Sequence, residues 1–158
     1  MFSTNYLPHI GGAELALKEI TDRIKDIHFD LITSRLDQFS NFSKSLPEKE
    51  QIGNLTVYRV GTVSTLMEFL LPKNFFPISA LLKARELTNK FGSYDSVFAL
   101  QASQGAGGAW LYKFFHRKPS FVLNIQEGKE LKEQGFLFNL FRSLIIKKAD
   151  LVIVISNI

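Results

Sequence analysis

The chain has 158 residues, of which 46% are hydrophobic and 22% charged, so a single globular domain is expected and a disordered chain is excluded. It contains no cysteine, which excludes disulfides, thiolate metal sites and a cysteine nucleophile. The net charge of +4 permits an anionic partner, but the 19 lysines and arginines are scattered along the chain, so nucleic acid is not expected as a partner.

The first segments predict a strand, a loop and a helix. Residues 1–4 are interpreted as the end of a strand. Over residues 12–27 apolar side chains recur with the spacing of one helical face, which continues through Ile24 and Ile27. We therefore expect a helix over this range, with both isoleucines buried.

The rest of the chain predicts alternating strands and helices. Pro77 is expected in the first turn of a helix, and Gly92 at that helix's C-cap. The last strand is a run of β-branched residues typical of burial on both faces. In chain order the predicted segments are strands at 29–33 and 54–60, a helix from Pro77, a strand at 94–100, a helix at 105–116, a strand at 120–126, a helix at 133–148 and a strand at 150–155.

This alternation predicts an α/β fold, a Rossmann-like parallel sheet with helices on both faces, formed by residues 1–158 as one domain. Two long connections interrupt it: 34–53 is polar, and 61–76 is apolar. Long connections in compact domains are usually functional or mobile. The first strand is short for a central strand, and the sequence stops directly after a core strand. We therefore expect a fragment of a longer enzyme.

A glycine pair, Gly11 and Gly12, lies between the first strand and the first helix. In open α/β sheets, ligands bind at the carboxyl ends of the strands. Glycines let a ligand approach the backbone, and the N–H groups of a helix's first turn suit a phosphate. A tight turn with close helix packing is an alternative interpretation of the same glycines, and composition alone leaves both open.

Residues 8–14 (Pro-His-Ile-Gly-Gly-Ala-Glu) resemble the proline–glycine–glycine–acid signature near the start of family 4 glycosyltransferases of the GT-B fold. The likeness continues in the family's order over nearly the whole chain. The further segments that resemble it are residues 54–60, 94–101, 118–123 and 149–156.

In that family two Rossmann-like domains face each other across a cleft, and the amino-terminal one mainly binds the acceptor. The resemblance implies that this chain is the acceptor-binding domain of a glycosyltransferase, which moves a sugar from a nucleotide-sugar donor to an acceptor hydroxyl. It further implies that Gly11 and Gly12 approach the donor's diphosphate. No segment matches the carboxyl-terminal donor domain, so we expect the chain to be inactive without it. No metal or other cofactor is expected.

The acceptor-side candidates are polar residues at predicted strand ends: His9, Gln101, Gln104, Gln126 and Glu127. Gln126 stands where the family often has a histidine, and a glutamine cannot act as a base near neutral pH. No catalytic residue is therefore assigned. Glu127 has a second interpretation as a solvated residue before a turn, and the glycines after Gln104 have one as a helix-packing surface.

Other functions stay open at this point. In an NAD(P)-binding oxidoreductase domain, Arg35 would face an NADP phosphate, although the usual acidic residue at that strand end is missing. In a two-chain transferase, the chain would be a non-catalytic acceptor- or membrane-binding subunit. The apolar stretches 61–76 and 136–148 suit either packing or contact with a membrane and a lipid-linked acceptor. We expect a cytoplasmic protein, with a peripheral position at the inner membrane face left open.

Overall fold

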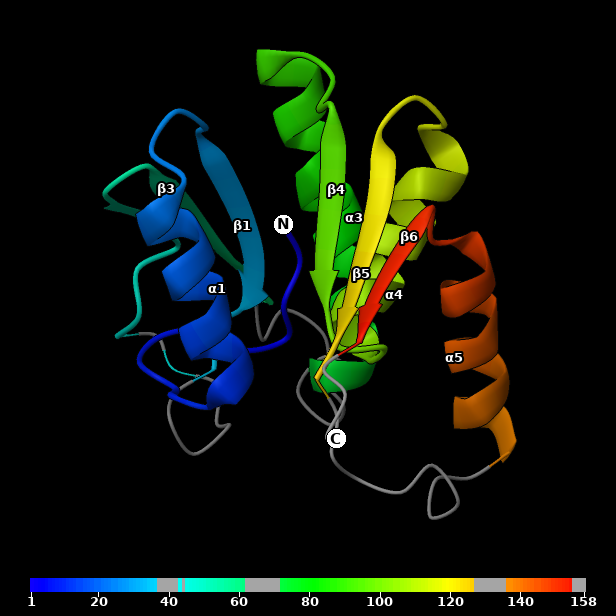
Figure 1. Cartoon of the computed structure of the whole chain (residues 1–158). Coiled ribbons are helices and arrows are strands. Elements are labelled where there is room, and N and C mark those ends of the chain that lie inside the picture. Colours follow the sequence, from blue (N-terminus) through cyan, green and yellow to red (C-terminus); the bar gives the residue numbers. More distant parts are fainter. Residues whose placement is uncertain (37–42, 44, 62–71, 127–135, 155–158) are drawn as a thin grey trace.

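The computed structural model describes residues 1–36, 43, 45–61, 72–126 and 136–154. Its helices and strands alternate as an α/β fold (Figure 1). In chain order they are α1 (Gly12–Arg23), β1 (Phe29–Ser34), β2 (Lys49–Ile52), β3 (Leu55–Val60), α3 (Pro72–Phe91), β4 (Ser96–Leu100), α4 (Gln104–Phe115), β5 (Ser120–Ile125), α5 (Phe136–Lys148) and β6 (Leu151–Val154).

The strands form two groups, with orders β1-β3-β2 and β4-β5-β6, and the first residues of the chain join them. Phe2 forms parallel bridges to Ile32 of β1 and to Ala99 of β4. Its amide donates to the Phe98 carbonyl oxygen at 2.8 Å, and its carbonyl oxygen accepts from the Leu100 amide at 3.1 Å. Residues 1–4 thus stand centrally in the sheet, as the sequence predicted.

The resulting parallel order is β3, β1, residues 1–4, β4, β5, β6, which is the order of a Rossmann-like sheet. Of the described strands, β2 alone runs antiparallel, at the outer edge beside β3. The strand order reverses at residues 1–4, because the chain first builds the sheet on one side of them and later on the other. The carboxyl end of this segment is therefore a topological switch point.

Helices cover both faces of the sheet, as predicted (Figure 1). On one face, Leu17 of α1 packs on Leu31, Leu55 and Val57, all of which are fully or almost fully buried. On the other face, α3 and α4 pack against each other and cover the strands, with α5 beside α4. Burying side chains of this size contributes about 1.5–3 kcal/mol each, so these two clusters hold the layers together.

The first helix is shorter than predicted. It ends at Arg23, and both Ile24 and Ile27 are exposed, so their predicted burial is wrong. The side-chain amide of Asn54 donates to the Ile24 and Ile27 carbonyl oxygens at 2.7 and 2.8 Å. These bonds satisfy backbone groups of the turn that leads into β1, so the chain reverses where apolar spacing alone would continue the helix.

The polar connection 34–53 contains a strand, β2, that the sequence did not reveal. Its residues, Lys-Glu-Gln-Ile, lack the apolar alternation typical of strands, because the strand lies at a sheet edge. The Lys49 ammonium lies 5.7 Å from the centre of the Tyr58 ring on β3. This segment is therefore a strand because it pairs with β3 and contacts its side chains. Its own composition does not favour a strand.

Helix α3 begins at Pro72, so Pro77 lies inside the helix and its predicted first-turn position is wrong. Phe76, the residue before Pro77, lies within the helix and is buried in the core. The Pro77 ring packs close to Gly107 of α4. Gly92 has φ +98° and its amide donates to the Thr88 carbonyl oxygen at 2.9 Å, which confirms the predicted C-cap.

The last strand is not buried on both faces as predicted. Leu151, Ile153 and Val154 are exposed, because β6 is an edge strand that has β5 as its one neighbour among the described strands. In the described ranges, none of the helices combines the length and the apolar character that crossing a bilayer requires.

Candidate functional site

The carboxyl ends of the strands meet around the switch point, and backbone hydrogen bonds join them. The Thr4 carbonyl oxygen accepts from the Ser34 amide at 3.2 Å, which ties the first segment to the end of β1. The Gln101 amide donates to the Asn124 carbonyl oxygen at 2.7 Å, which ties the end of β4 to β5. The loop before α1 and the start of α4 both lie at this edge.

The two glycines before α1 differ in their surroundings. A Cβ on Gly11 would lie 2.6 Å from Glu14 Oε2, the end of a flexible side chain that covers Gly11. A Cβ on Gly12 would meet no described atom within 4 Å, and Gly12 is exposed. The Glu14 side chain therefore covers Gly11, whereas the backbone at Gly12 is open to an approaching molecule.

The carboxylate of Glu14, a residue in the first turn of α1, lies at the start of the helix. No side-chain hydrogen bond caps the helix at Gly11, while Glu14 is buried with its carboxylate close to Gly11. The positive end of the helix dipole favours this negative charge. An anionic ligand at the same place would compete with the Glu14 carboxylate. His9 Nε2 lies 4.0 Å from the Gly11 Cβ position, so the His9 ring is close to the same place.

Arg59 of β3 is a site residue that sequence reasoning missed. Its side chain is 3% exposed, and its Nη2 lies 2.8 Å from Glu50 Oε2 and donates to the Leu7 carbonyl oxygen at 2.9 Å. The guanidinium thus holds the loop before α1 onto β3. A charged residue inside an otherwise apolar strand was the available signal, since a buried charge must be paired.

Helix α4 starts against the first segment of the chain. A Cβ on Gly105 would lie 2.9 Å from the Thr4 backbone nitrogen and 3.2 Å from Ser3 Cα. The close-packing interpretation therefore holds for Gly105. No described side chain caps α4 at Ser103, so the N–H groups of its first turn also point toward the switch point.

Gln101 has φ +62° and is the one non-glycine residue with a positive φ among the described residues. This left-handed backbone conformation costs roughly 1–2 kcal/mol. It occurs where β4 ends beside the switch point, and such strain often marks a functional constraint.

Several buried oxygens near this edge have no hydrogen-bond partner among the described residues: Thr4 Oγ1, Asn5 Oδ1, Tyr6 Oη and Asn124 Oδ1. Asn124 is only 7% exposed. Buried polar atoms are nearly always paired, so each exception calls for an explanation such as water or a ligand. Sequence reasoning did not single out these residues, because an asparagine at a strand end carries no burial signal.

The predicted acceptor-side residues are distributed as follows. His9, Gln101, Gln104 and Gln126 are all described, are half-buried and follow strands at the carboxyl edge. Gln126 directly follows β5. Gln101 and Gln104 follow β4, the strand that pairs with β5. Glu127 lies outside the described residues. Among the described residues, no cluster of three or more His, Asp or Glu side chains is arranged to hold a metal ion.

Arg35, the residue on which the NADP interpretation rests, lies in a pocket of about 330 Å³ beside Gly61 and Lys83. Its Nη1 contacts Glu48 Oε1 at 3.0 Å, and its Nε donates to the Leu46 carbonyl oxygen at 2.7 Å. The guanidinium therefore binds the segment that leads into β2.

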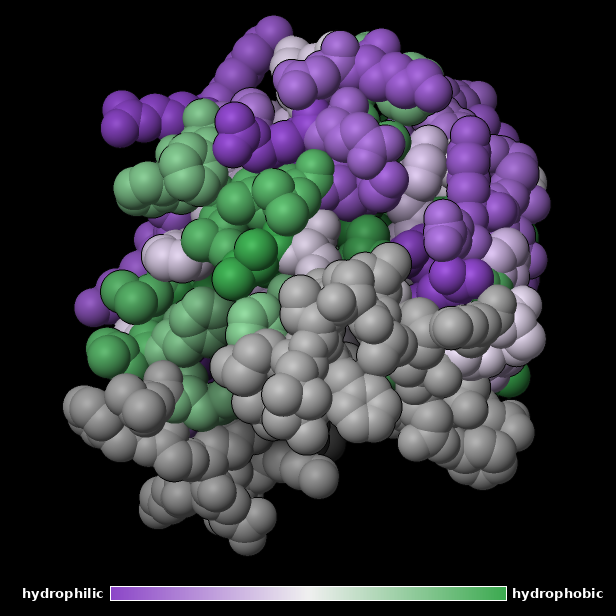
Figure 2. Space-filling view, turned by 180° about the vertical axis from the view of Figure 1, so that it is seen from behind, coloured by the Kyte–Doolittle hydropathy of each residue, from purple (hydrophilic) through white to green (hydrophobic). Residues whose placement is uncertain are grey.

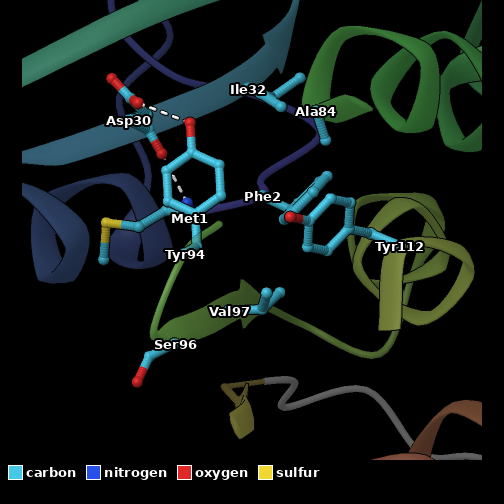
Figure 3. A pocket seen from close by; sticks show the side chains of 9 residues that line it. All are labelled: Met1, Phe2, Asp30, Ile32, Ala84, Tyr94, Ser96, Val97 and Tyr112. Carbon is cyan, nitrogen blue, oxygen red and sulfur yellow. Dashed lines mark hydrogen bonds between the residues drawn. The ribbon is translucent and has the colours of Figure 1, made fainter. Parts of the chain in front are cut away.

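The opposite edge, at the amino ends of the strands, encloses a cavity of about 20 Å³ (Figure 3). Tyr94 Oη donates to Asp30 Oδ2 at 2.6 Å, and the Met1 amino group donates to the Asp30 carbonyl oxygen at 2.5 Å. Burial lowers the pKa of the Met1 amine to about 5, and burial with the Asp30 hydrogen bond raises the pKa of Tyr94. The cavity has room for about one water molecule, not for a substrate.

The carboxyl edge is therefore the candidate binding site. Comparison of the sequence with models of known protein families and with curated proteins found no match.

Proposed function

We propose that the chain is the acceptor-binding domain of a glycosyltransferase, one half of a GT-B fold, which needs a donor-binding domain for activity. The enzyme would transfer a sugar from a nucleotide-sugar donor to an acceptor hydroxyl, on a free sugar or a lipid-linked acceptor. The observation that carries the proposal is the convergence of the α1 and α4 N-termini at the switch point, with Gly12 open beside them.

The chemistry follows from this arrangement. The acceptor oxygen bonds to the anomeric carbon, the bond from that carbon to the diphosphate oxygen breaks, and the hydroxyl proton passes to the departing diphosphate. Negative charge grows on the diphosphate, which N–H groups at the start of α1 suit. Glu14 lies at this position, so its carboxylate moves aside when the diphosphate enters.

Neutral polar groups suit the acceptor. Asn5 and Asn124 supply buried amide oxygens that lack partners among the described residues, and Gln101 adds an amide at the same edge. Amides both donate and accept hydrogen bonds, which matches the hydroxyls of an uncharged sugar.

A charge placed at Gly12 tests the diphosphate part of the proposal. We expect uridine or guanosine diphosphate, added to the isotope-labelled chain, to shift the amide resonances of Gly11, Gly12 and Ala13. Gly12→Asp adds a carboxylate in open space and should abolish the shifts without unfolding the chain. Ser120→Asp is the matched control, because it adds the same charge at the exposed amino end of β5.

The result would contradict the proposal if neither diphosphate shifted these resonances, or if both variants changed binding equally. A turnover assay adds an independent test. Residues 1–158 alone should transfer no sugar, whereas a longer protein that includes a donor domain should do so. Transfer by the chain alone would contradict the proposal that a donor-binding domain is needed for activity.

The two other functions would give different results in the titration and the turnover assay. Saturable binding of NADP, lost in Arg35→Ala and with no response to either diphosphate, would favour an oxidoreductase domain. A donor domain on a separate chain that restores transfer would favour the two-chain transferase.

A further inference from the structure

Helices α4 and α5 expose a group of large apolar side chains on their outer side. Phe114 is 60% exposed and Phe115 57%, and Leu140 and Leu144 of α5 are exposed as well. Figure 2, seen from the side of these helices, shows a hydrophobic area with hydrophilic residues above it. We call the set Trp110, Phe114, Phe115, Leu140 and Leu144 the aromatic face.

Ring contacts connect the aromatic residues of this face and link α4 to α5. Trp110 and Phe114 are one helical turn apart on α4, with ring centres 6.5 Å apart. The Trp110 ring also meets the edge of Phe141 on α5 at 6.1 Å, which joins the two helices. Leu140 and Leu144 are likewise one turn apart. Exposed apolar groups scattered singly need no explanation, whereas a contiguous patch marks an interaction site.

Cationic side chains border this face toward the C-terminal ends of the helices. The Arg85 guanidinium lies 5.8 Å from the centre of the Phe115 ring. The exposed Asp150 nearby is paired with Lys113 at 2.8 Å, and Glu86, which follows Arg85, is paired with Lys83 at 2.6 Å. The exposed cations of the border are Arg85, Lys90, Arg117, Lys118, Lys147 and Lys148.

We propose that the aromatic face docks on an anionic lipid bilayer. Tryptophan and phenylalanine enter the boundary between headgroups and acyl chains, while lysine and arginine attract anionic headgroups. A second copy of the chain is the competing occupant, and the sedimentation-velocity measurement below distinguishes it from a bilayer. This inference is independent of the proposed function, since it concerns the outer surface of α4 and α5.

Co-sedimentation with vesicles tests the proposal. The chain should bind vesicles of equal parts phosphatidylglycerol and phosphatidylcholine at 50 mM NaCl, and bind pure phosphatidylcholine at least tenfold more weakly. Phe114→Ser with Leu144→Ser should lower binding at least tenfold. The matched control is Leu15→Ser with Ile27→Ser, which removes two exposed apolar side chains on the α1 side and should leave binding unchanged.

The cationic border has its own pair of variants. Lys147→Gln with Lys148→Gln should weaken binding about tenfold or more, since each lysine near an anionic surface contributes about fivefold. Lys25→Gln with Lys49→Gln, both exposed elsewhere, should not. Unchanged thermal unfolding verifies that the variants fold.

Three results would overturn the proposal. These are no binding to the anionic vesicles, full binding by the aromatic double variant, or a concentration-dependent dimer in sedimentation velocity that this variant abolishes.

Discussion

The two edges of the sheet differ in how completely their polar groups are paired. At the amino edge, the Asp30 carboxylate, the Tyr94 hydroxyl and the Met1 amine are hydrogen-bonded around a cavity of about 20 Å³. At the carboxyl edge, Asn5 and Asn124 keep buried oxygens without partners among the described residues. The polar groups named at the amino edge are thus hydrogen-bonded, whereas those named at the carboxyl edge have oxygens without described partners.

This difference separates groups that hold the fold from groups arranged for a ligand. Unpaired buried oxygens, a left-handed Gln101 and two helix starts without side-chain caps all cost stability. Because all of these features lie around the switch point, binding is a better explanation than incomplete packing. Substitutions at the amino edge should therefore destabilise the chain, and several at the carboxyl edge should not.

Acid should have the largest effect, through the amino edge. Folding lowers the pKa of the Met1 amine from 8.0 to about 5, so the folded chain favours the neutral amine. Above pH 8 the amine is neutral in both states and does not affect stability. As the pH falls from 8 to 5, the unfolded chain takes up a proton that burial keeps off the folded chain, which destabilises the fold by at most about 4 kcal/mol. Urea unfolding at pH 8, 6.5 and 5 measures it. The N-terminally acetylated chain, which cannot gain this charge, is the control, and an equal loss in both would contradict the assignment.

Alanine at Gly105 should have the next largest effect. Its Cβ would lie 2.9 Å from the Thr4 backbone nitrogen, and backbone cannot move aside as a flexible side chain can. We expect a loss of about 2–3 kcal/mol in the free energy of unfolding. Gly12→Ala is the matched control, because its Cβ meets nothing described within 4 Å, and it should be neutral or stabilising by about 0.5 kcal/mol. Equal effects in urea titrations would show that the two glycines do not differ.

The contrast between Gly11 and Gly12 shows how much of the structure the sequence could predict. The location of Gly11 and Gly12 between strand and helix followed from local spacing, as did the alternation of strands and helices. Which glycine is covered and which stays open did not follow, because Glu14 folds back over Gly11 only in three dimensions.

The wrong predictions have the same origin. Pro77 lies inside a helix whose Phe76 is buried by the rest of the chain, and the polar β2 is a strand because β3 pairs with it. Arg59 and Asn124 were missed because their importance lies in burial and partners contributed by distant segments. Local pattern predicts the elements, whereas tertiary contacts decide their limits and which polar residues matter.

Two tyrosines offer a smaller test of the edges. Tyr94→Phe removes the donor to Asp30 and should cost about 1.5–3 kcal/mol, the usual value for a hydrogen bond to a charged group. Tyr6→Phe removes a buried hydroxyl with no described partner, so it should be neutral or slightly stabilising. Both side chains lose the same atom, so chemical denaturation of the two variants isolates the pairing. Equal losses would mean that Tyr6 is paired in solution.

Asn124→Val should have a small effect on stability, and in the opposite direction to Gly105→Ala and Tyr94→Phe. Valine suits a strand and removes the buried oxygen that lacks a partner among the described residues, so we expect a gain of about 1 kcal/mol. The same change should abolish acceptor binding if this amide holds a sugar hydroxyl. A stabilised variant that no longer binds would show that Asn124 is kept for its ligand at a cost in stability. A destabilised variant would show instead that its amide supports the carboxyl edge, as Asp30 supports the amino edge.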